Sequence, residues 1–168
     1  RGRAGVPVVV TSADVSRVMA SGSGVVRQPP GARALVSRIV IVYTSSASQE
    51  LVTRGGAQEG SVVATPVSYT WQWGDGTTTT TTDPGAAYPD HTVYHRYSRT
   101  ARGVTITLTT TWTATYSVAG GPPQPVSGTL TTTDTADPFG VSGFSRTVGT
   151  RCSGGGIGWD YVESEVLG

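Results

Sequence analysis

The clearest pattern of hydrophobic and polar positions lies between residues 104 and 118. The even positions are mostly apolar, from Val104 and Ile106 through Trp112 to Val118, while every odd position is Thr or Ser. Strict alternation of this kind predicts a long antiparallel strand with one buried face and one face of hydroxyl groups. A Gly- and Pro-rich turn at 119–123 and a second alternating run at 126–133 predict that this strand folds back as a hairpin.

Weaker alternation predicts the remaining strands. Arg33–Tyr43 is apolar on both faces, which predicts a strand covered on both sides. Further strands are expected at 8–10, 49–53, 61–64, 69–73, 77–82 and 93–97, with a hairpin turn at 54–56. One short helix is expected at Ser12–Met19, with Ser12 as its N-cap. Seven or eight short strands predict an all-β fold, a β-sandwich with extended hairpins.

Composition supports the all-β class and narrows the function. The 168 residues include 27 Thr and 23 Val against 5 Leu and 4 Ile, which disfavours helical bundles, Rossmann-type enzymes and TIM barrels. The net charge of +1 gives no electrostatic case for nucleic acid, and no apolar run approaches the length of a membrane span. All 12 basic residues are Arg and Asn is absent, which indicates a GC-rich bacterial genome. A Thr-, Ser- and Gly-rich chain with few charges is typical of exported proteins, so we expect an extracellular, cell-surface location.

Two motifs carry a family resemblance. The run Tyr69-Thr-Trp71-Gln-Trp73-Gly74-Asp75-Gly76 resembles the strand and turn of the PKD (polycystic kidney disease) domain family, with Trp73 in place of the usual Phe. His95-Arg-Tyr97, Gly103 and the alternating strand that follows resemble the family's second motif. The stretch Tyr116–Val126 is similar to a long hairpin of secreted actinobacterial PKD-like proteins. The resemblance implies an immunoglobulin-like β-sandwich that makes protein or carbohydrate contacts without being an enzyme.

The resemblance also suggests a division of the chain. We expect an N-terminal extension with a short strand at 1–30, a PKD-like sandwich at 31–140, and a C-terminal tail at 141–168 that serves in assembly. The first residue is Arg1, so we expect a processed or partial chain. Cys152 has no second cysteine to pair with, which leaves a free thiol or an intermolecular bridge.

The residues that could serve in catalysis or metal binding are better explained by structural roles. Asp75 lies between two glycines, where a carboxylate fixes a turn by accepting backbone N–H bonds. His91 and His95 are four residues apart, about 13 Å on a strand, which is too far for one zinc ion; we expect His95 to bond locally at the core edge. The loop acids Asp83, Asp90, Asp134 and Asp137 fit no calcium loop. We therefore expect no metal, no cofactor and no enzymatic activity.

Charge asymmetry suggests how the chain would find a partner. The net charge of residues 1–54 is +5, and the net charge of residues 134–168 is −3. Oppositely charged ends favour head-to-tail contact between copies of the chain. Such contact builds a filament when successive copies do not close into a ring. The partner-binding candidates are Arg17, Arg27, Arg33 and Arg38 at the basic end, and Trp159, Asp160, Tyr161, Glu163 and Glu165 in the tail.

The tail has two expected destinations. It folds back on its own domain, or it adds a strand to a neighbour's open edge, which the sequence favours. We therefore expect a structural or assembly module that contacts itself or another surface protein. A carbohydrate-binding or adhesion module is the alternative, and binding of ordered water by Thr-x-Thr rows comes third.

Overall fold

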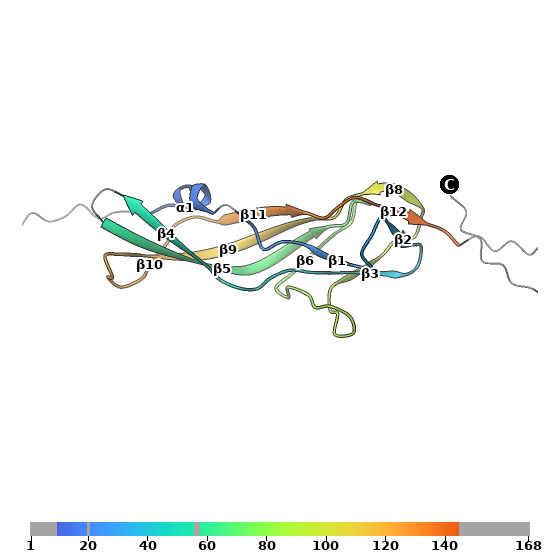
Figure 1. The fold of residues 1–168 in the computed structure, drawn as a ribbon, viewed down its shortest axis with the longest axis horizontal. Coiled ribbons are helices and arrows are strands. Elements are labelled where there is room, and N and C mark those ends of the chain that lie inside the picture. Colours follow the sequence, from blue (N-terminus) through green and yellow to red (C-terminus); the bar gives the residue numbers. More distant parts are fainter. Residues whose placement is uncertain (1–9, 20, 56–57, 145–168) are drawn as a thin grey trace, which may run out of the picture.

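The computed structural model describes residues 10–19, 21–55 and 58–144. The chain forms strands connected by turns, with one short helix in the described part (Figure 1). The elements are α1 (Ser12–Val18), β1 (Val26–Gln28), β2 (Arg33–Leu35), β3 (Ile39–Tyr43), β4 (Gln49–Gly55), β5 (Gln58–Gln72), β6 (Thr78–Thr81), β7 (Tyr94–Arg96), β8 (Ala101–Val104), β9 (Thr107–Val118), β10 (Gln124–Pro125), β11 (Leu130–Thr135) and β12 (Phe139–Ser142). The predicted all-β class is confirmed.

A long antiparallel ladder of β5 and β9 forms the spine of the molecule. The pairing runs from Gly60 opposite Val118 to Gln72 opposite Thr107, with a bulge between Pro66 and Ser68. Proline has no N–H to donate to the ladder, which explains the irregularity at this point. Strands β4 and β6 pair with the outer edge of β5, and β10 and β11 pair with the outer edge of β9.

Two three-stranded sheets complete one half of the molecule. In the first, β3 lies between β1 and β7, and all pairs are antiparallel. In the second, β12 lies between β2, to which it is parallel, and β8, to which it is antiparallel. Together with the adjoining half of the spine, these sheets enclose the main core.

The main core is aromatic and β-branched. Its members come from all three sheets and the segments between them: Ala34, Val40, Val42, Tyr69, Trp71, Trp73, Val93, Tyr97, Val104, Ile106, Leu108, Ala136, Phe139 and Val141. Trp71 and Trp73 are fully buried, as the alternation of the sequence predicts. Aromatic side chains bury more surface per residue than other side chains, so they contribute most to the stability of such a core.

A second, smaller core lies where the spine extends beyond the two small sheets. Val15 and Met19 from the α1 segment cover Trp112 of β9 and Leu130 of β11. Val62 and Ala64 of β5 complete it. The helix therefore covers the apolar face of this part of the spine.

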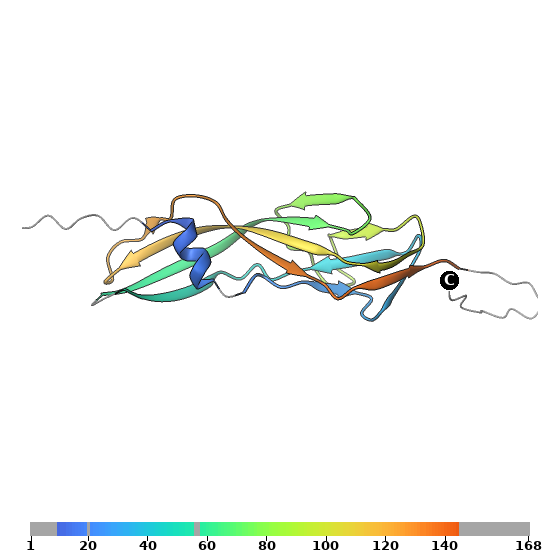
Figure 2. The same ribbon diagram turned by 90° about the horizontal axis from the view of Figure 1, so that it is seen from above.

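The molecule is elongated (Figures 1 and 2). The 15 residues of β5 alone extend about 50 Å. A compact globule of this chain length has a radius of gyration of about 15 Å and a diameter of about 40 Å. The α1 end and the end bearing β2, β8 and β12 are opposite poles, and the described chain ends at the latter pole, at Phe144.

Several predicted boundaries differ from the structure. The stretch Arg33–Tyr43 is two strands, because a turn with Ser37 at φ 65° carries the chain from one small sheet to the other. The predicted strand from Val104 is likewise broken after Val104, and β9 begins at Thr107. The helix is capped by Thr11 rather than Ser12: Thr11 and Asp14 form a capping box. The strand expected at 8–10 falls almost entirely outside the described residues.

The structure also integrates segments that the sequence assigned to extensions. Strand β1 pairs with β3, and α1 covers the second core, although both belong to the expected extension at 1–30. At the other boundary, β12 continues to Ser142 and buries Val141 in the main core. Both segments therefore take part in the fold, through strand pairing in β1 and through buried side chains in α1 and β12.

Candidate functional site

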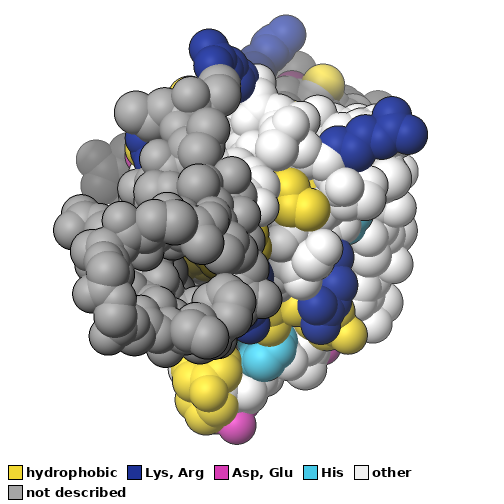
Figure 3. Space-filling model, turned by 90° about the vertical axis from the view of Figure 1, so that its right-hand side faces the viewer, with side chains coloured by type: hydrophobic (Ala, Val, Ile, Leu, Met, Phe, Trp, Pro, Cys, Tyr) yellow, Lys and Arg dark blue, Asp and Glu magenta, His cyan; other side chains and the backbone are white. Residues whose placement is uncertain are grey.

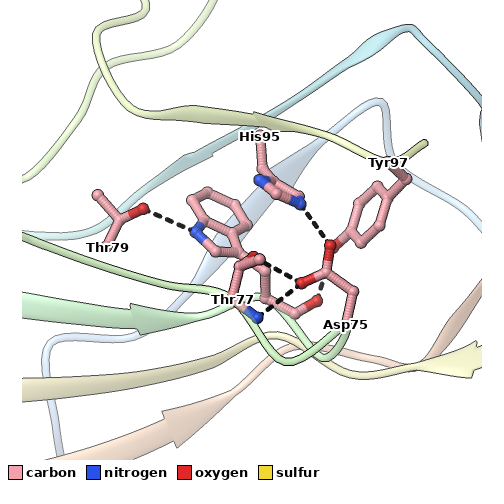
Figure 4. Close-up of polar contacts among 6 residues, drawn as sticks. Asp75, Thr77, Thr79, His95 and Tyr97 are labelled. Carbon is pink, nitrogen blue, oxygen red and sulfur yellow. Dashed lines mark hydrogen bonds and ion pairs between the residues drawn. The ribbon is translucent and has the colours of Figure 1, made fainter.

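The turn after β5 is fixed by a carboxylate, as expected for the first motif. Asp75 Oδ1 accepts hydrogen bonds from the Thr77 backbone N–H at 3.0 Å and from the Thr77 hydroxyl at 2.6 Å (Figure 4). Gly74 and Gly76 both have positive φ, 80° and 91°. A Cβ atom at Gly74 would lie 2.5 Å from the carbonyl oxygen of Thr105, so this position needs glycine for space as well as conformation.

The second motif closes over this turn. His95 Nε2 lies 2.7 Å from Asp75 Oδ2, and the imidazole stacks on Trp73 with 4.8 Å between ring centroids. The Tyr97 hydroxyl donates to the Trp73 carbonyl at 2.8 Å, and Trp73 Nε1 donates to the Thr79 hydroxyl (Figure 4). The two sequence motifs thus form one assembly, which we call the turn cluster: Trp73, Asp75, Thr77, His95 and Tyr97. His95 bonds across 20 residues of chain rather than locally as expected.

The electrostatics of the turn cluster favour a charged Asp75. Burial raises the pKa of the Asp75 carboxyl, but hydrogen bonds from Thr77 and His95 outweigh it and bring the pKa below its ordinary value. Burial, followed by the charge of Asp75, raises the pKa of Tyr97, which therefore stays protonated as a donor. Each group is already engaged with another member of the cluster. The geometry therefore supports a structural role, and Gly103, at φ 63°, lies within β8 where the pairing with β12 is irregular.

A groove lined by arginine, hydroxyl and apolar side chains lies at the pole where the described chain ends. We call it the arginine groove; its lining residues are Val36, Ser37, Arg38, Arg96, Ser98, Arg99, Thr100, Gly143 and Phe144. It encloses about 620 Å³. Within the described part of the chain no acidic residue lines it. Figure 3 shows arginine and exposed hydrophobic side chains spread over this end of the molecule.

The partner-binding candidates do not form one basic patch. Arg17 lies on α1, toward the opposite pole from Arg38. Arg27 is engaged within the fold, since its guanidinium lies 4.2 Å from the centre of the Phe139 ring and donates to Pro29 and Gly31 carbonyls. Burial lowers the pKa of this guanidinium. Arg33 lies in β2, where it makes a further interaction.

The partner-binding residues predicted from the sequence differ from the residues that line the groove. Trp159, Asp160, Tyr161, Glu163 and Glu165 lie outside the described residues, as does Cys152. Arg96 and Arg99, which line the groove, were not among the candidates. The sequence does contain a signal for this site, because three arginines fall within seven residues, at 96, 99 and 102.

An exposed aromatic patch lies beside β7. Tyr88 and Tyr94 keep 70% and 50% of their surfaces exposed, and His91 contacts both rings at centroid distances of 5.9 Å and 5.8 Å. The Tyr88 backbone N–H donates to the Gln28 side chain of β1, which holds the 84–93 segment against the sheet. Tyr94 is part of β7, whereas Tyr88 and His91 belong to the irregular segment that precedes it.

Two further features bear on ligands and membranes. Within the described ranges, no group of three or more His, Cys, Asp or Glu side chains is gathered closely enough to hold a metal ion. The same part of the chain contains no helix with the length and apolar character of a membrane span.

Comparison of the chain with protein-family models, curated proteins and solved structures finds no match. The resemblance to PKD domains therefore rests on the two sequence motifs alone.

Proposed function

We propose that this chain is a non-enzymatic structural module of a bacterial cell surface, an immunoglobulin-like, PKD-like domain that assembles through its poles. The observation that carries the proposal is the elongated all-β body, whose spine strand β5 alone exceeds the diameter of a compact globule of this size. A stiff, elongated body of this kind keeps the partners bound at its two poles a fixed distance apart. Sheet pairing supplies the stiffness, because β5 and β9 are held together from Gly60 to Gln72.

The surface of the spine is consistent with an exported module. Thr113, Thr115, Thr131 and Thr133 are exposed on β9 and β11, and Thr78–Thr80 are exposed on β6. Hydroxyl-rich strands keep a sheet soluble without charge, and cross-strand Thr pairs such as Thr70 with Thr80, 3.1 Å between hydroxyl oxygens, stabilise it.

Self-association across a concentration series tests the proposal. We expect sedimentation of the purified chain to show growing species between micromolar and millimolar concentration. Electron microscopy of these species should show rods joined at their poles, with a repeat above about 50 Å. A monodisperse monomer across the whole series would overturn assembly through the poles.

A glycan-binding module is the second candidate, and the exposed aromatic patch favours it. Tyr88 and Tyr94 offer two accessible ring faces beside the polar groups of Gln28 and Arg96, a combination that suits stacking on sugar rings. Affinity electrophoresis in gels containing cell-wall polysaccharides tests this candidate. Retardation of the native chain that is lost in Tyr88→Ala/Tyr94→Ala, and retained in Tyr116→Ala, would support it.

A further inference from the structure

The arginine groove concentrates positive charge that the described structure does not neutralise. Arg38, Arg96 and Arg99 share one cavity, and the side chains of Arg38 and Arg99 make no hydrogen bond or ion pair with the described residues. Arg96 donates to the Ser37 carbonyl at 2.8 Å, which anchors its guanidinium at the groove. Ser98 and Thr100 add hydroxyl donors. Clustered guanidinium groups with hydroxyl neighbours are a typical site for carboxylate ligands.

The groove has an apolar part as well. Phe144 keeps 68% of its surface exposed, and Val36 is partly buried beside it. A ligand that matches this lining carries carboxylates next to aromatic or aliphatic side chains, so an acidic peptide fits better than a small inorganic anion.

We propose that the arginine groove binds the acidic segment 159–165 of the same chain. This segment reads Trp-Asp-Tyr-Val-Glu-Ser-Glu and supplies three carboxylates, those of Asp160, Glu163 and Glu165, with two aromatic side chains. The number of carboxylates equals the number of arginines that line the groove. Complementary charge of this kind gives specificity and depends on ionic strength.

The position of the groove selects the same chain as the source of the segment. Phe144, the last described residue, itself lines the groove, so the connection to the acidic segment starts there. The 14 residues from 145 to 158 reach at most about 45 Å when extended and about 20 Å as a random coil. A tether of this length gives an effective concentration of about a millimolar, far above that of a second copy at micromolar concentration. The sequence alone favours a neighbour's edge, whereas the position of the groove favours the same chain.

This inference goes beyond the proposed assembly and does not depend on it. Assembly is measured by sedimentation and microscopy of the whole chain, whereas the groove is measured by peptide binding at concentrations where the chain is dilute.

The test uses the full chain and a fluorescent peptide with the sequence of residues 157–168. A triple variant, Asp160→Asn, Glu163→Gln and Glu165→Gln, neutralises the chain's own segment and frees the groove. In low salt we expect the peptide to bind this variant at least tenfold more tightly than it binds the native chain, whose own segment competes. Binding should weaken at least tenfold in 0.5 M salt.

Two arginine variants locate the binding site. Adding Arg38→Gln and Arg99→Gln to the neutralised chain should weaken peptide binding at least tenfold, and Arg96 is left intact because its bond to Ser37 is structural. The matched control adds Arg17→Gln, which removes an exposed charge on α1 and should leave affinity unchanged. Thermal unfolding of each variant verifies that it is folded.

Each other result overturns the proposal. Equal affinity for the native and neutralised chains would mean that the segment does not occupy the groove. Unchanged affinity in the Arg38→Gln/Arg99→Gln variant, or no binding at all, would exclude the groove as the site. A native chain that dimerises at micromolar concentration, and loses dimers when the segment is neutralised, would assign the segment to a second copy.

Discussion

The carboxylate of Asp75 stabilises the folded chain through the contacts of its two oxygens with Thr77 and His95. Asp75→Ala removes them, and we expect it to lower the free energy of unfolding by about 1–3 kcal/mol. Asp90→Ala, in an exposed turn, is the matched control and should change it by less than about 0.5 kcal/mol. Urea unfolding at neutral pH measures both. An Asp75→Ala variant with native stability would contradict the role assigned to this turn.

The same carboxylate makes a testable contribution to acid sensitivity. Because the pKa of Asp75 is lower in the folded chain than its ordinary value, its stabilisation is present above that ordinary value and is lost as the pH falls through the folded pKa. The difference in unfolding free energy between the native chain and Asp75→Ala should therefore shrink below about pH 4. A difference that stays constant from pH 7 to pH 2 would show that the charge of Asp75 contributes nothing.

The two core tryptophans differ in their indole N–H groups. Trp73 Nε1 donates to Thr79, whereas Trp71 Nε1 is buried without a hydrogen-bond partner. Replacing either with Phe leaves a similar cavity, but Trp71→Phe also removes an unsatisfied donor. We expect Trp73→Phe to cost about 1 kcal/mol more than Trp71→Phe, measured by chemical unfolding of both variants. The reverse order would mean that the N–H of Trp71 is satisfied in solution.

At the scale of elements, alternation predicted which residues are buried better than where strands end. Val40 and Val42 are fully buried and Ile41 nearly so, as the two-sided apolar run predicts. The run nevertheless crosses between two sheets at Ser37, and the run from Val104 crosses similarly before Thr107. Side-chain alternation continues through the second crossing, so the sequence carries no signal of that change in pairing partner, whereas the first crossing falls at the polar pair Ser37-Arg38 within an apolar run.

Helix α1 is an element whose stability depends on packing. Its seven residues are too few for a stable isolated helix, so its capping box and its contacts with Trp112 and Leu130 must hold it. We expect Met19→Ala to undock it and to speed tryptic cleavage after Arg17 at least tenfold, because cleavage follows the open population. Ser16→Ala, on the exposed side, is the control. Equal cleavage of both variants would mean that Met19 does not anchor the helix.

At the scale of the whole molecule, the candidate site was only partly predictable. The turn cluster follows from two motifs, although the pairing of His95 with Asp75 required the fold. The arginine groove did not follow, because it combines Arg38 from the turn before β3 with Arg96 and Arg99 from a segment about 60 residues later. The net charge of residues 1–54 groups Arg17 with Arg38 in one basic end, but in the folded chain the two residues lie toward opposite poles. A count of charges along the sequence cannot detect this separation in space.

The length of the body gives a direct test of the whole arrangement. Spin labels at Val52 of β4 and Arg102 of β8, in a Cys152→Ser background, lie toward opposite poles. Val52 is opposite Ser61, and the 11 steps from Ser61 to Gln72 already span about 36 Å. Because β8 lies beyond that end of β5, we expect a distance above about 40 Å, more than the diameter of a compact globule of this chain length.

The control pair places labels at Val52 and Thr115, which lie two strands apart in one sheet. Neighbouring strands are about 4.8 Å apart, so this distance should be below about 20 Å once the label side chains are included. Both pairs share the Val52 label and the same background, so any distortion by that label affects them equally. A long pair no farther apart than about 30 Å would mean that the body bends back on itself. A bent body of that kind could not hold two contacts apart, and the proposed spacing role would fail with it.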